Sequence, residues 1–348
     1  MSKIYKSAYI VTKALPFHNG HKFLVDTALE KSEKVTLLIC SLKSEPIPGD
    51  IRIKWAKNIY KDNKRINILH CNEELPQYPE EHEDFWNIWK DVAKRYCPDD
   101  IDVIFTSEEY GEPYSKHLNI KHHLVDLERK TVPVSGTMVR ENPFNNWWNI
   151  PHQVRPYFVK RIAIMGPEST GKSSLTKKLA SFYYTNFVIE YGRHVYATNG
   201  NKITIDDFIP ISTGRQSLED WMILDSNKLI FCDTEDLTTY IFSKMYFPEE
   251  FHTVINYFED VLDKKEKYDL YILLKPDCPS IQDGTRNFLE ERNDHYEIIK
   301  QEMIDREYNF VEIGGDWENR FEESKEIITK MFNINQKVIF PIGNVSIK

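Results

Sequence analysis

The stretch Gly166-Pro167-Glu168-Ser169-Thr170-Gly171-Lys172-Ser173 connects an apolar run, residues 161–165, to a segment with helically spaced apolar side chains. Its glycines let successive backbone N–H groups converge on a polyphosphate, and the following helix adds the positive end of its dipole. A strand, a loop of this composition and a helix, in that order, are the context of a phosphate-binding P-loop. We therefore predict a P-loop kinase domain at residues 159–335 that binds Mg-ATP.

Two side chains of this loop have predicted chemical roles. Lys172 is expected to reach the β- and γ-phosphates of ATP, and the Ser173 hydroxyl to bind Mg²⁺. A second Mg²⁺ ligand should be an acid that ends an apolar strand, and Asp233 follows such a run at residues 229–232. Asp233 would hold the metal or orient the attacking hydroxyl, and capping the next helix is its alternative role. The predicted ATP contacts are Gly166, Glu168, Ser169, Thr170, Gly171, Lys172, Ser173 and Ser174.

The segment Gln282-Asp283-Gly284-Thr285-Arg286 has the composition of an active-site lid. An arginine in such a lid neutralises charge that develops on a transferred phosphoryl group. Arg286 is the first candidate for this role and Arg292 the second, with a solvated loop arginine as the alternative. The length of the domain favours a small-molecule kinase over a motor ATPase.

The first half of the chain alternates short β-branched runs with amphipathic segments. Strands are predicted at residues 9–11, 35–40, 66–69 and 101–105, with helices at 20–31, 53–60 and 85–96. This rhythm indicates an α/β fold with a parallel sheet. A second such rhythm starts at residue 161, with further strands at 187–189, 229–232, 270–274 and 310–313 and a closing helix at 318–332.

The two rhythms are separated by residues 142–158, where prolines alternate with asparagines and tryptophans. This composition predicts an extended connector. We therefore divide the chain into a first domain at residues 1–141, the connector at 142–158, the kinase domain at 159–335 and a tail at 336–348.

Two histidines mark the candidate site of the first domain. His18 and His21 lie between the first strand and the first helix, where phosphates are attracted. They are placed to donate hydrogen bonds to the α-phosphate of a nucleotide while pyrophosphate leaves. The start of a later helix carries Ser135, Thr137 and Arg140, which could bind the β- and γ-phosphates. A Ser-x-Thr sequence at a helix start is usually a helix cap, which is the alternative role.

Aromatic residues gather near these motifs. Trp55 shares a predicted helix with Arg52, and Trp86 and Trp89 share another with i, i+3 spacing. Stacking on a base or a pyridinium ring is one role for these tryptophans. Packing in the core is the other.

Composition limits the partners of the chain. The 54 acidic and 45 basic residues give a net charge of −9, which argues against holding nucleic acid by its backbone. The five cysteines form no CxxC pair, so we expect buried free thiols. The N-terminus lacks the apolar core of a signal peptide, and no run approaches about 18 apolar residues. We predict a cytoplasmic protein with no membrane partner.

Together these motifs resemble the bifunctional NadR family, whose members join a nicotinamide mononucleotide (NMN) adenylyltransferase to a ribosylnicotinamide kinase. The resemblance runs from about residue 9 to 332. It includes Pro16-Phe17-His18-Asn19-Gly20-His21 (the His18 motif), residues 135–140, the connector and the P-loop. It implies a Rossmann-like nucleotidyltransferase domain followed by the kinase domain. Ribosylnicotinamide, NMN, ATP and NAD would be its ligands, with Mg²⁺ and ATP used in both reactions. The predicted catalytic residues are His18, His21, Arg140, Lys172, Asp233 and Arg286, and the predicted substrate-binding residues are Arg52, Trp55, Trp89, Glu190, Tyr191 and Arg193.

Two features depart from the family pattern. Thr12 and Ala14 stand where the first motif usually has a glycine and an aromatic residue. The Thr12 side chain would crowd a closely approaching nucleotide, unless a local backbone shift accommodates it. A helix-turn-helix module, which some relatives carry, has no room before the first strand, so we expect no direct DNA binding.

Two alternative functions remain open at this point. One is a fusion enzyme that acts on another nucleoside or on a phosphopantetheine-type substrate. The other is a nucleotide-sensing regulator with a weakened first domain. A homo-oligomer is compatible with the sequence in each case.

Overall fold

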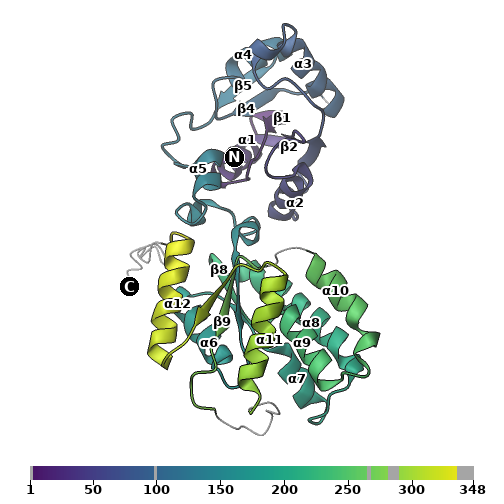
Figure 1. The fold of residues 1–348 in the computed structure, drawn as a ribbon. Coiled ribbons are helices and arrows are strands. Elements are labelled where there is room, and N and C mark those ends of the chain that lie inside the picture. Colours follow the sequence, from purple (N-terminus) through teal and green to yellow (C-terminus); the bar gives the residue numbers. More distant parts are fainter. Residues whose placement is uncertain (1–2, 98–99, 265–267, 281–289, 335–348) are drawn as a thin grey trace. The chain divides into compact units, whose positions relative to one another are not determined.

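The computed structural model describes residues 3–97, 100–264, 268–280 and 290–334. The chain forms two compact units, residues 1–155 and 156–348. In its described part, each unit contains a sheet of five parallel strands flanked by helices (Figure 1). The predicted α/β fold class with two parallel sheets is therefore confirmed. Within these ranges no helix combines the length and the apolar character needed to cross a bilayer.

The first unit has the strand order β3-β2-β1-β4-β5. Helices α1 and α2 lie on one side of this sheet and α3 and α4 on the other (Figure 1). Right-handed crossovers produce this arrangement, because the chain steps outward from β1 to β3 and then returns to the far side of β1. The elements are β1 (Tyr5–Thr12), α1 (Asn19–Lys31), β2 (Ser32–Cys40), α2 (Gly49–Ile59), β3 (Ile66–Cys71), α3 (Phe85–Tyr96), β4 (Val103–Thr106), α4 (Gly111–Leu118), β5 (Lys121–Leu124) and α5 (Gly136–Glu141).

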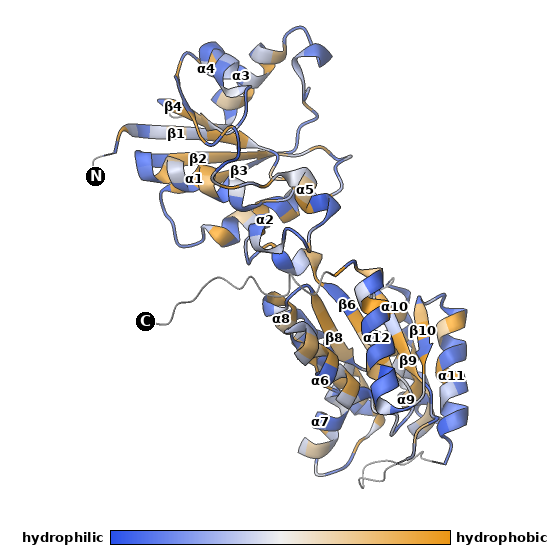
Figure 2. Ribbon diagram, turned by 90° about the vertical axis from the view of Figure 1, so that its left-hand side faces the viewer, coloured by the Kyte–Doolittle hydropathy of each residue, from blue (hydrophilic) through white to orange (hydrophobic). Residues whose placement is uncertain are grey.

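Strand β1 is central because it is apolar on both faces. Ala8, Tyr9, Ile10 and Val11 are all buried, as expected for a parallel strand that is covered by helices on both sides. Figure 2 shows hydrophobic colours concentrated in the strands of both sheets, whereas the helices alternate hydrophobic and hydrophilic residues.

The sequence did not predict α4 or β5. The sequence of β5, Lys121-His122-His123-Leu124, has no apolar alternation, and its two end residues are exposed. The strand lies at the edge of the sheet and pairs with β4. Because an edge strand can be polar on both faces, hydrophobic periodicity gave no signal for it.

The segment predicted as an extended connector is compact over residues 142–155. It contains a short 3-10 turn, η2 (Trp147–Asn149), and buries Phe144, Trp147, Ile150 and Val154. The Arg155 guanidinium lies over the Trp148 ring at 4.7 Å from its centroid. Apolar side chains spaced three or four residues apart give this irregular backbone one buried face, and the extended interpretation was wrong for that reason.

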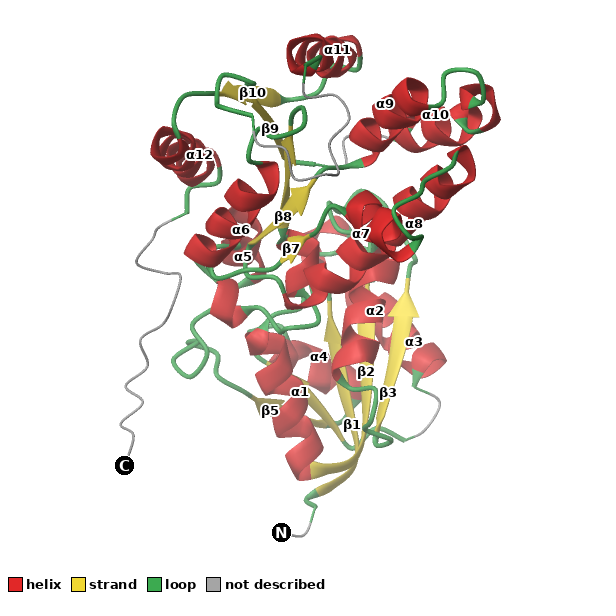
Figure 3. Ribbon diagram, turned by 90° about the horizontal axis from the view of Figure 1, so that it is seen from below, coloured by secondary structure: helices red, strands yellow, loops and turns green. Residues whose placement is uncertain are grey.

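The second unit has the strand order β10-β9-β6-β8-β7. Helices α6 and α12 lie on one side of its sheet and α9 and α11 on the other (Figures 1 and 3). Strands β8 and β9 are buried at every residue, in keeping with their nearly continuous apolar sequences. The elements are β6 (Lys160–Met165), α6 (Lys172–Tyr183), β7 (Phe187–Val188), α7 (Tyr191–Thr198), α8 (Phe208–Met222), β8 (Leu229–Asp233), α9 (Asp236–Tyr246), α10 (Ile255–Asp263), β9 (Leu270–Leu274), α11 (Arg292–Asp305), β10 (Phe310–Ile313) and α12 (Trp317–Met331).

Both sheets have a topological switch point beside a central strand. β1 lies between β2 and β4, and β6 lies between β8 and β9. Ligands of open parallel sheets bind outside the carboxyl ends of the strands at such points. The His18 motif follows β1 and the P-loop follows β6, so both motifs lie where the topology predicts a site.

Candidate functional site

The P-loop has the backbone conformation that its glycines allow. Gly166 and Gly171 have φ angles of +142° and +88°, which side-chain-bearing residues rarely adopt. A Cβ atom at Gly166 would also lie 2.8 Å from the carbonyl oxygen of Leu274. The loop folds back over its lysine, and Lys172 Nζ donates to the Pro167 carbonyl at 2.9 Å. The ammonium group is thus already held inside the curl where a phosphate would bind.

Asp233 ends β8 beside this loop. It is 3 % exposed, and its Oδ1 has no hydrogen-bond partner among the described residues. Burial, and secondly the charge of Glu190, raise the pKa of Asp233 to about 6, while Lys172 and a hydrogen bond with Ser173 oppose that shift. A buried carboxylate oxygen without a partner, next to a serine hydroxyl, fits the donor set of a hard divalent cation. The residues predicted for Mg²⁺ are therefore brought together.

A cavity of about 200 Å³ opens from the P-loop. Of the predicted ATP contacts, all but Gly166 line it, from Glu168 to Ser174. The predicted substrate-binding residues Glu190, Tyr191 and Arg193 line it as well. The two sets, separate in sequence, therefore share one cavity.

The second set lies at the start of α7. Arg193 Nε and Glu190 Oε2 are 3.1 Å apart. The Tyr191 ring lies against α8 at Gly214, where a Cβ atom would be only 2.4 Å from the ring. Gly214 therefore allows Tyr191 to face the cavity from this position.

A buried arginine that the sequence analysis did not identify donates hydrogen bonds to the backbone of the P-loop and its neighbours. Arg320 on α12 is 1 % exposed and donates to the carbonyls of Thr170 and Gly315, each at 2.9 Å, and of Lys275 at 3.0 Å. It also pairs with Asp277. The available signal was an arginine on the apolar face of the predicted closing helix.

The arginine predicted for the lid, Arg286, lies outside the described residues. The second candidate, Arg292, begins α11 and donates to the Pro276 and Cys278 carbonyls at 2.9 and 2.8 Å. It also approaches the Ser169 carbonyl at 3.5 Å. Arg292 thus contacts the P-loop backbone.

In the first unit, the two histidines form the N-terminal cap of α1. The backbone N–H of His18 donates to His21 Nδ1 at 3.2 Å, and that of Gly20 donates to His18 Nδ1 at 3.1 Å. Each imidazole therefore carries its proton on Nε2. Burial lowers the pKa of His21 to about 4 and also lowers the pKa of His18. Both rings are neutral hydrogen-bond donors at neutral pH.

The second phosphate-binding motif lies against the same loop. Arg140 donates to the Leu15 carbonyl, and its other terminal nitrogen donates to Thr137 Oγ1 at 3.1 Å. Ser135 caps α5 by accepting from the N–H of Met138. A Cβ atom at position 136 would lie 2.4 Å from the Leu15 oxygen, so a glycine is needed there. Residues 135–140 and the His18 motif are therefore brought together.

Arg52 also supports this loop. It is completely buried, donates to the Lys13 carbonyl at 2.8 Å and pairs with Glu45 at 2.7 Å. Trp55 is buried on the same helix. Trp89 Nε1 donates to the Pro76 carbonyl, and its ring packs edge-on against Tyr114. Arg52 thus holds the backbone of the loop, whereas Trp55 and Trp89 take part in packing.

Two comparisons bear on the family. Residues 7–138 match the model of the citrate lyase ligase C-terminal domain, and residues 161–320 match that of an AAA domain. The trifunctional NAD biosynthesis/regulator protein NadR of Escherichia coli (strain K12) is 31% identical over 344 residues, with 92% of this chain and 82% of that protein covered. The chain belongs to the NadR family. The NadR of Salmonella typhimurium (strain LT2) is 30% identical over the same shares.

Solved NadR structures have the same fold. A crystal structure of NadR in complex with NR covers 96% of this chain and 99% of its own, with a TM-score of 0.81 and 19% identity. A complex with NAD and AMP-PNP gives a TM-score of 0.80 at 20% identity. The structural similarity covers both units of this NadR family member. The fold of each unit therefore has a counterpart in the solved NadR structures.

Thr12 is expected to be accommodated rather than to crowd the nucleotide. Its Oγ1 accepts a hydrogen bond at 3.2 Å from the N–H of Ala14, which has a φ of +48°. Thr12→Gly should therefore leave the rate of NMN adenylylation unchanged and lower stability by about 1–2 kcal/mol. Steady-state rates and melting temperatures would measure both, with Thr12→Ser as the control that keeps the hydroxyl. A faster Thr12→Gly variant with unchanged melting would support crowding instead.

Asp233→Asn should stabilise the protein at pH 8 in the absence of divalent cations. The carboxyl has a folded-state pKa of about 6 against an ordinary value of 3.8. Its contribution to stability therefore falls as pH rises from about 4 to 6, by roughly 3 kcal/mol. The melting temperature of the variant should exceed that of the parent at pH 8 and converge with it near pH 4. Mg²⁺ should raise the melting temperature of the parent more than that of the variant, and a variant less stable at pH 8 would contradict the assignment.

Proposed function

We propose that this chain is a bifunctional enzyme of NAD biosynthesis. Its second unit transfers the γ-phosphoryl group of ATP to ribosylnicotinamide and gives NMN. Its first unit transfers the adenylyl group of ATP to NMN and gives NAD and pyrophosphate. The proposal is carried by two separate phosphate-binding loops, each at the switch point of its own parallel sheet, in a chain of the NadR family.

In the kinase unit, Lys172 binds the β- and γ-phosphates and the P-loop N–H groups hold the polyphosphate chain. Asp233 accepts a hydrogen bond from the 5′-hydroxyl of ribosylnicotinamide and orients it toward the γ-phosphorus. Ser173 and Asp233 would hold Mg²⁺, which supplies neutralisation of phosphate charge when bound. Glu190, Tyr191 and Arg193 bind the acceptor, and Arg286 is proposed to stabilise the transferred group.

In the adenylyltransferase unit, a phosphate oxygen of NMN attacks the α-phosphorus of ATP, and the bond to the pyrophosphate oxygen breaks. The Nε2–H groups of His18 and His21 donate to the oxygens of the α-phosphate, where negative charge builds up. Arg140, with Thr137 and Ser135, receives the departing β- and γ-phosphates. The contacts of Arg52 with the Lys13 carbonyl support this site indirectly.

The direct test is to incubate the purified protein with ribosylnicotinamide, ATP and Mg²⁺ and to separate the products over time. NMN should appear first and NAD should follow. Formation of neither product, or phosphorylation only of other nucleosides, would overturn the proposal. A regulator that binds these ligands without turnover would retain them but give no NMN.

Lys172→Ala should separate the two activities. Lys172 belongs to the second unit, where its ammonium group is proposed to bind the β- and γ-phosphates of ATP. Without it, conversion of ribosylnicotinamide to NMN should fall below detection. Formation of NAD from supplied NMN should persist, because the His18 motif belongs to the other unit. Circular dichroism would verify folding. Loss of both activities in a folded variant would contradict the two-site proposal.

His21→Ala should slow adenylyl transfer by about 100-fold or more, since one donor to transition-state charge contributes on the order of 3 kcal/mol. The loss should appear in kcat rather than in the KM for NMN, because the charge is absent in the ground state. Since His21 also accepts the N–H of His18, His21→Asn is the matched control that keeps an acceptor. His21→Asn should recover melting temperature and leave the rate low, whereas a change in KM alone would make His21 a binding residue.

A further inference from the structure

The connector is hydrogen-bonded to the His18 motif. Asn19 is the first residue of α1 and lies between the N-cap His18 and Gly20. Its side-chain Nδ2 donates to the carbonyl of Trp148, in the turn η2, at 2.9 Å, although the two residues are 129 positions apart. The loop that carries the two histidines is therefore attached to the connector through the side chain of Asn19.

The same turn of the connector is also bonded to the second phosphate-binding motif. Asn146 Nδ2 donates to the carbonyl of Met138 at 3.0 Å and to that of Asn142 at 2.9 Å. Met138 lies on α5 between Thr137 and Arg140. Contacts two positions apart in the connector, at residues 146 and 148, thus reach the two motifs that are expected to hold the phosphates of ATP.

The contacts within the connector keep this turn in place. The side chain of Trp147 is 1 % exposed and anchors η2 in the first unit. The Arg155 guanidinium lies 4.7 Å from the centroid of the Trp148 ring, and Arg155 Nε donates to the carbonyl of Ile150 at 2.9 Å. A buried aromatic ring and an arginine that bonds to both ends of the turn restrain its backbone. The two asparagine contacts therefore meet one ordered piece of chain.

The spacing of the two motifs matters for the reaction proposed for the first unit. One ATP molecule must place its α-phosphate at His18 and His21 while its β- and γ-phosphates lie at Thr137 and Arg140. In catalysis, a misplacement of about 1 Å can slow a reaction by about 100-fold. Arg140 already links the motifs directly through the Leu15 carbonyl, and the connector provides a second link between them.

We propose that Asn19 and Asn146 are positioning residues of the adenylyltransferase, through which the connector fixes the distance between the two phosphate-binding motifs. This inference rests on the adenylyltransferase function proposed above. The two side chains act through the backbone that they hold, Asn19 on the start of α1 and Asn146 on α5. The connector is then part of the adenylyltransferase site, in addition to joining the two units.

The test measures NAD formation from supplied NMN and ATP for Asn19→Ala, Asn146→Ala and the double variant. Each single substitution should lower kcat by about 10-fold. The KM values for NMN and ATP should change by less than about threefold, because every group proposed to bind these substrates is retained. The double variant should be about as slow as each single variant rather than about 100-fold slower than the parent, because either substitution alone disconnects the two motifs.

Asn145→Ala is the matched control. Asn145 is exposed beside Asn146, and the contact it makes with Asn142 uses its backbone N–H, so this variant should keep the kcat of the parent. Phosphorylation of ribosylnicotinamide by the second unit should be unchanged in every variant, and melting temperatures would report on the stability of the first unit.

The outcomes separate positioning from stability alone. If the single variants melt lower but keep the kcat of the parent, the contacts are only structural, so the inference is wrong and the proposed function stands. A rise in KM with kcat unchanged, or a fully multiplicative loss in the double variant, would also overturn it. A parent protein that forms no NAD from NMN would reject the proposed adenylyltransferase function and this inference with it.

Discussion

Arginine side chains hold the carbonyl oxygens of both phosphate-binding loops. In the first unit, Arg52 binds the carbonyl of Lys13 and Arg140 that of Leu15. In the second unit, Arg320 binds the carbonyl of Thr170. A loop that offers its N–H groups to an anion must find other partners for its carbonyl groups, and a guanidinium provides several donors in one plane. Both candidate sites depend on these hydrogen bonds, because they stabilise the conformation of each loop in the ligand-free protein.

The parts of the site that the sequence predicts are those whose chemistry is local. A phosphate requires glycine, lysine and serine at fixed spacing, and an imidazole pair at a helix start caps the helix by itself. Arg320 is different, because it acts on a carbonyl 150 residues away in the sequence. No local pattern encodes such pairs, and a buried arginine in an amphipathic helix looks like a surface residue until the fold is known.

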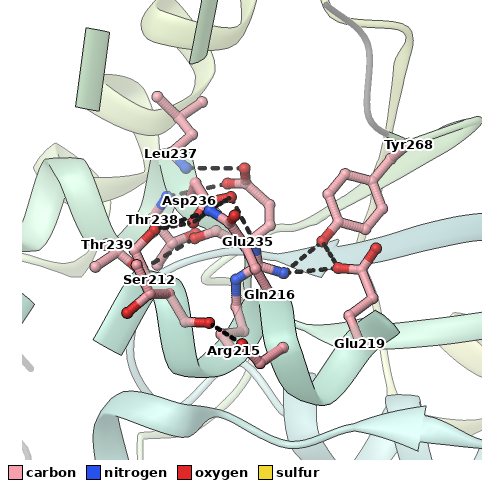
Figure 4. Close-up of polar contacts among 12 residues, drawn as sticks. Ser212, Arg215, Gln216, Glu219, Glu235, Asp236, Leu237, Thr238, Thr239 and Tyr268 are labelled. Carbon is pink, nitrogen blue, oxygen red and sulfur yellow. Dashed lines mark hydrogen bonds and ion pairs between the residues drawn. The ribbon is translucent and has the colours of Figure 1, made fainter. Parts of the chain in front are cut away.

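Several buried polar groups near the P-loop lower the stability of the ligand-free protein. Asp233 is a buried carboxylate with an unpaired oxygen, and Arg215 and Thr238 each have a buried polar atom without a partner among the described residues. Each such group destabilises the ligand-free protein. Arg215 and Thr238 line the cavity of the P-loop, and Asp233 ends the strand β8 beside that loop. The charge of Arg215 itself is paired with Glu219 and Asp236 (Figure 4).

The polar edge strand β5 has a consequence for the behaviour of the chain in solution. An exposed sheet edge offers free backbone groups to which a strand of a second molecule can add, and this is a common route to aggregation. Strand β5 has only four residues, and it places a lysine and two histidines along its length. The short, hydrophilic edge makes such strand addition unfavourable. The composition that hid β5 from hydrophobic periodicity therefore also protects the open side of the sheet from self-association.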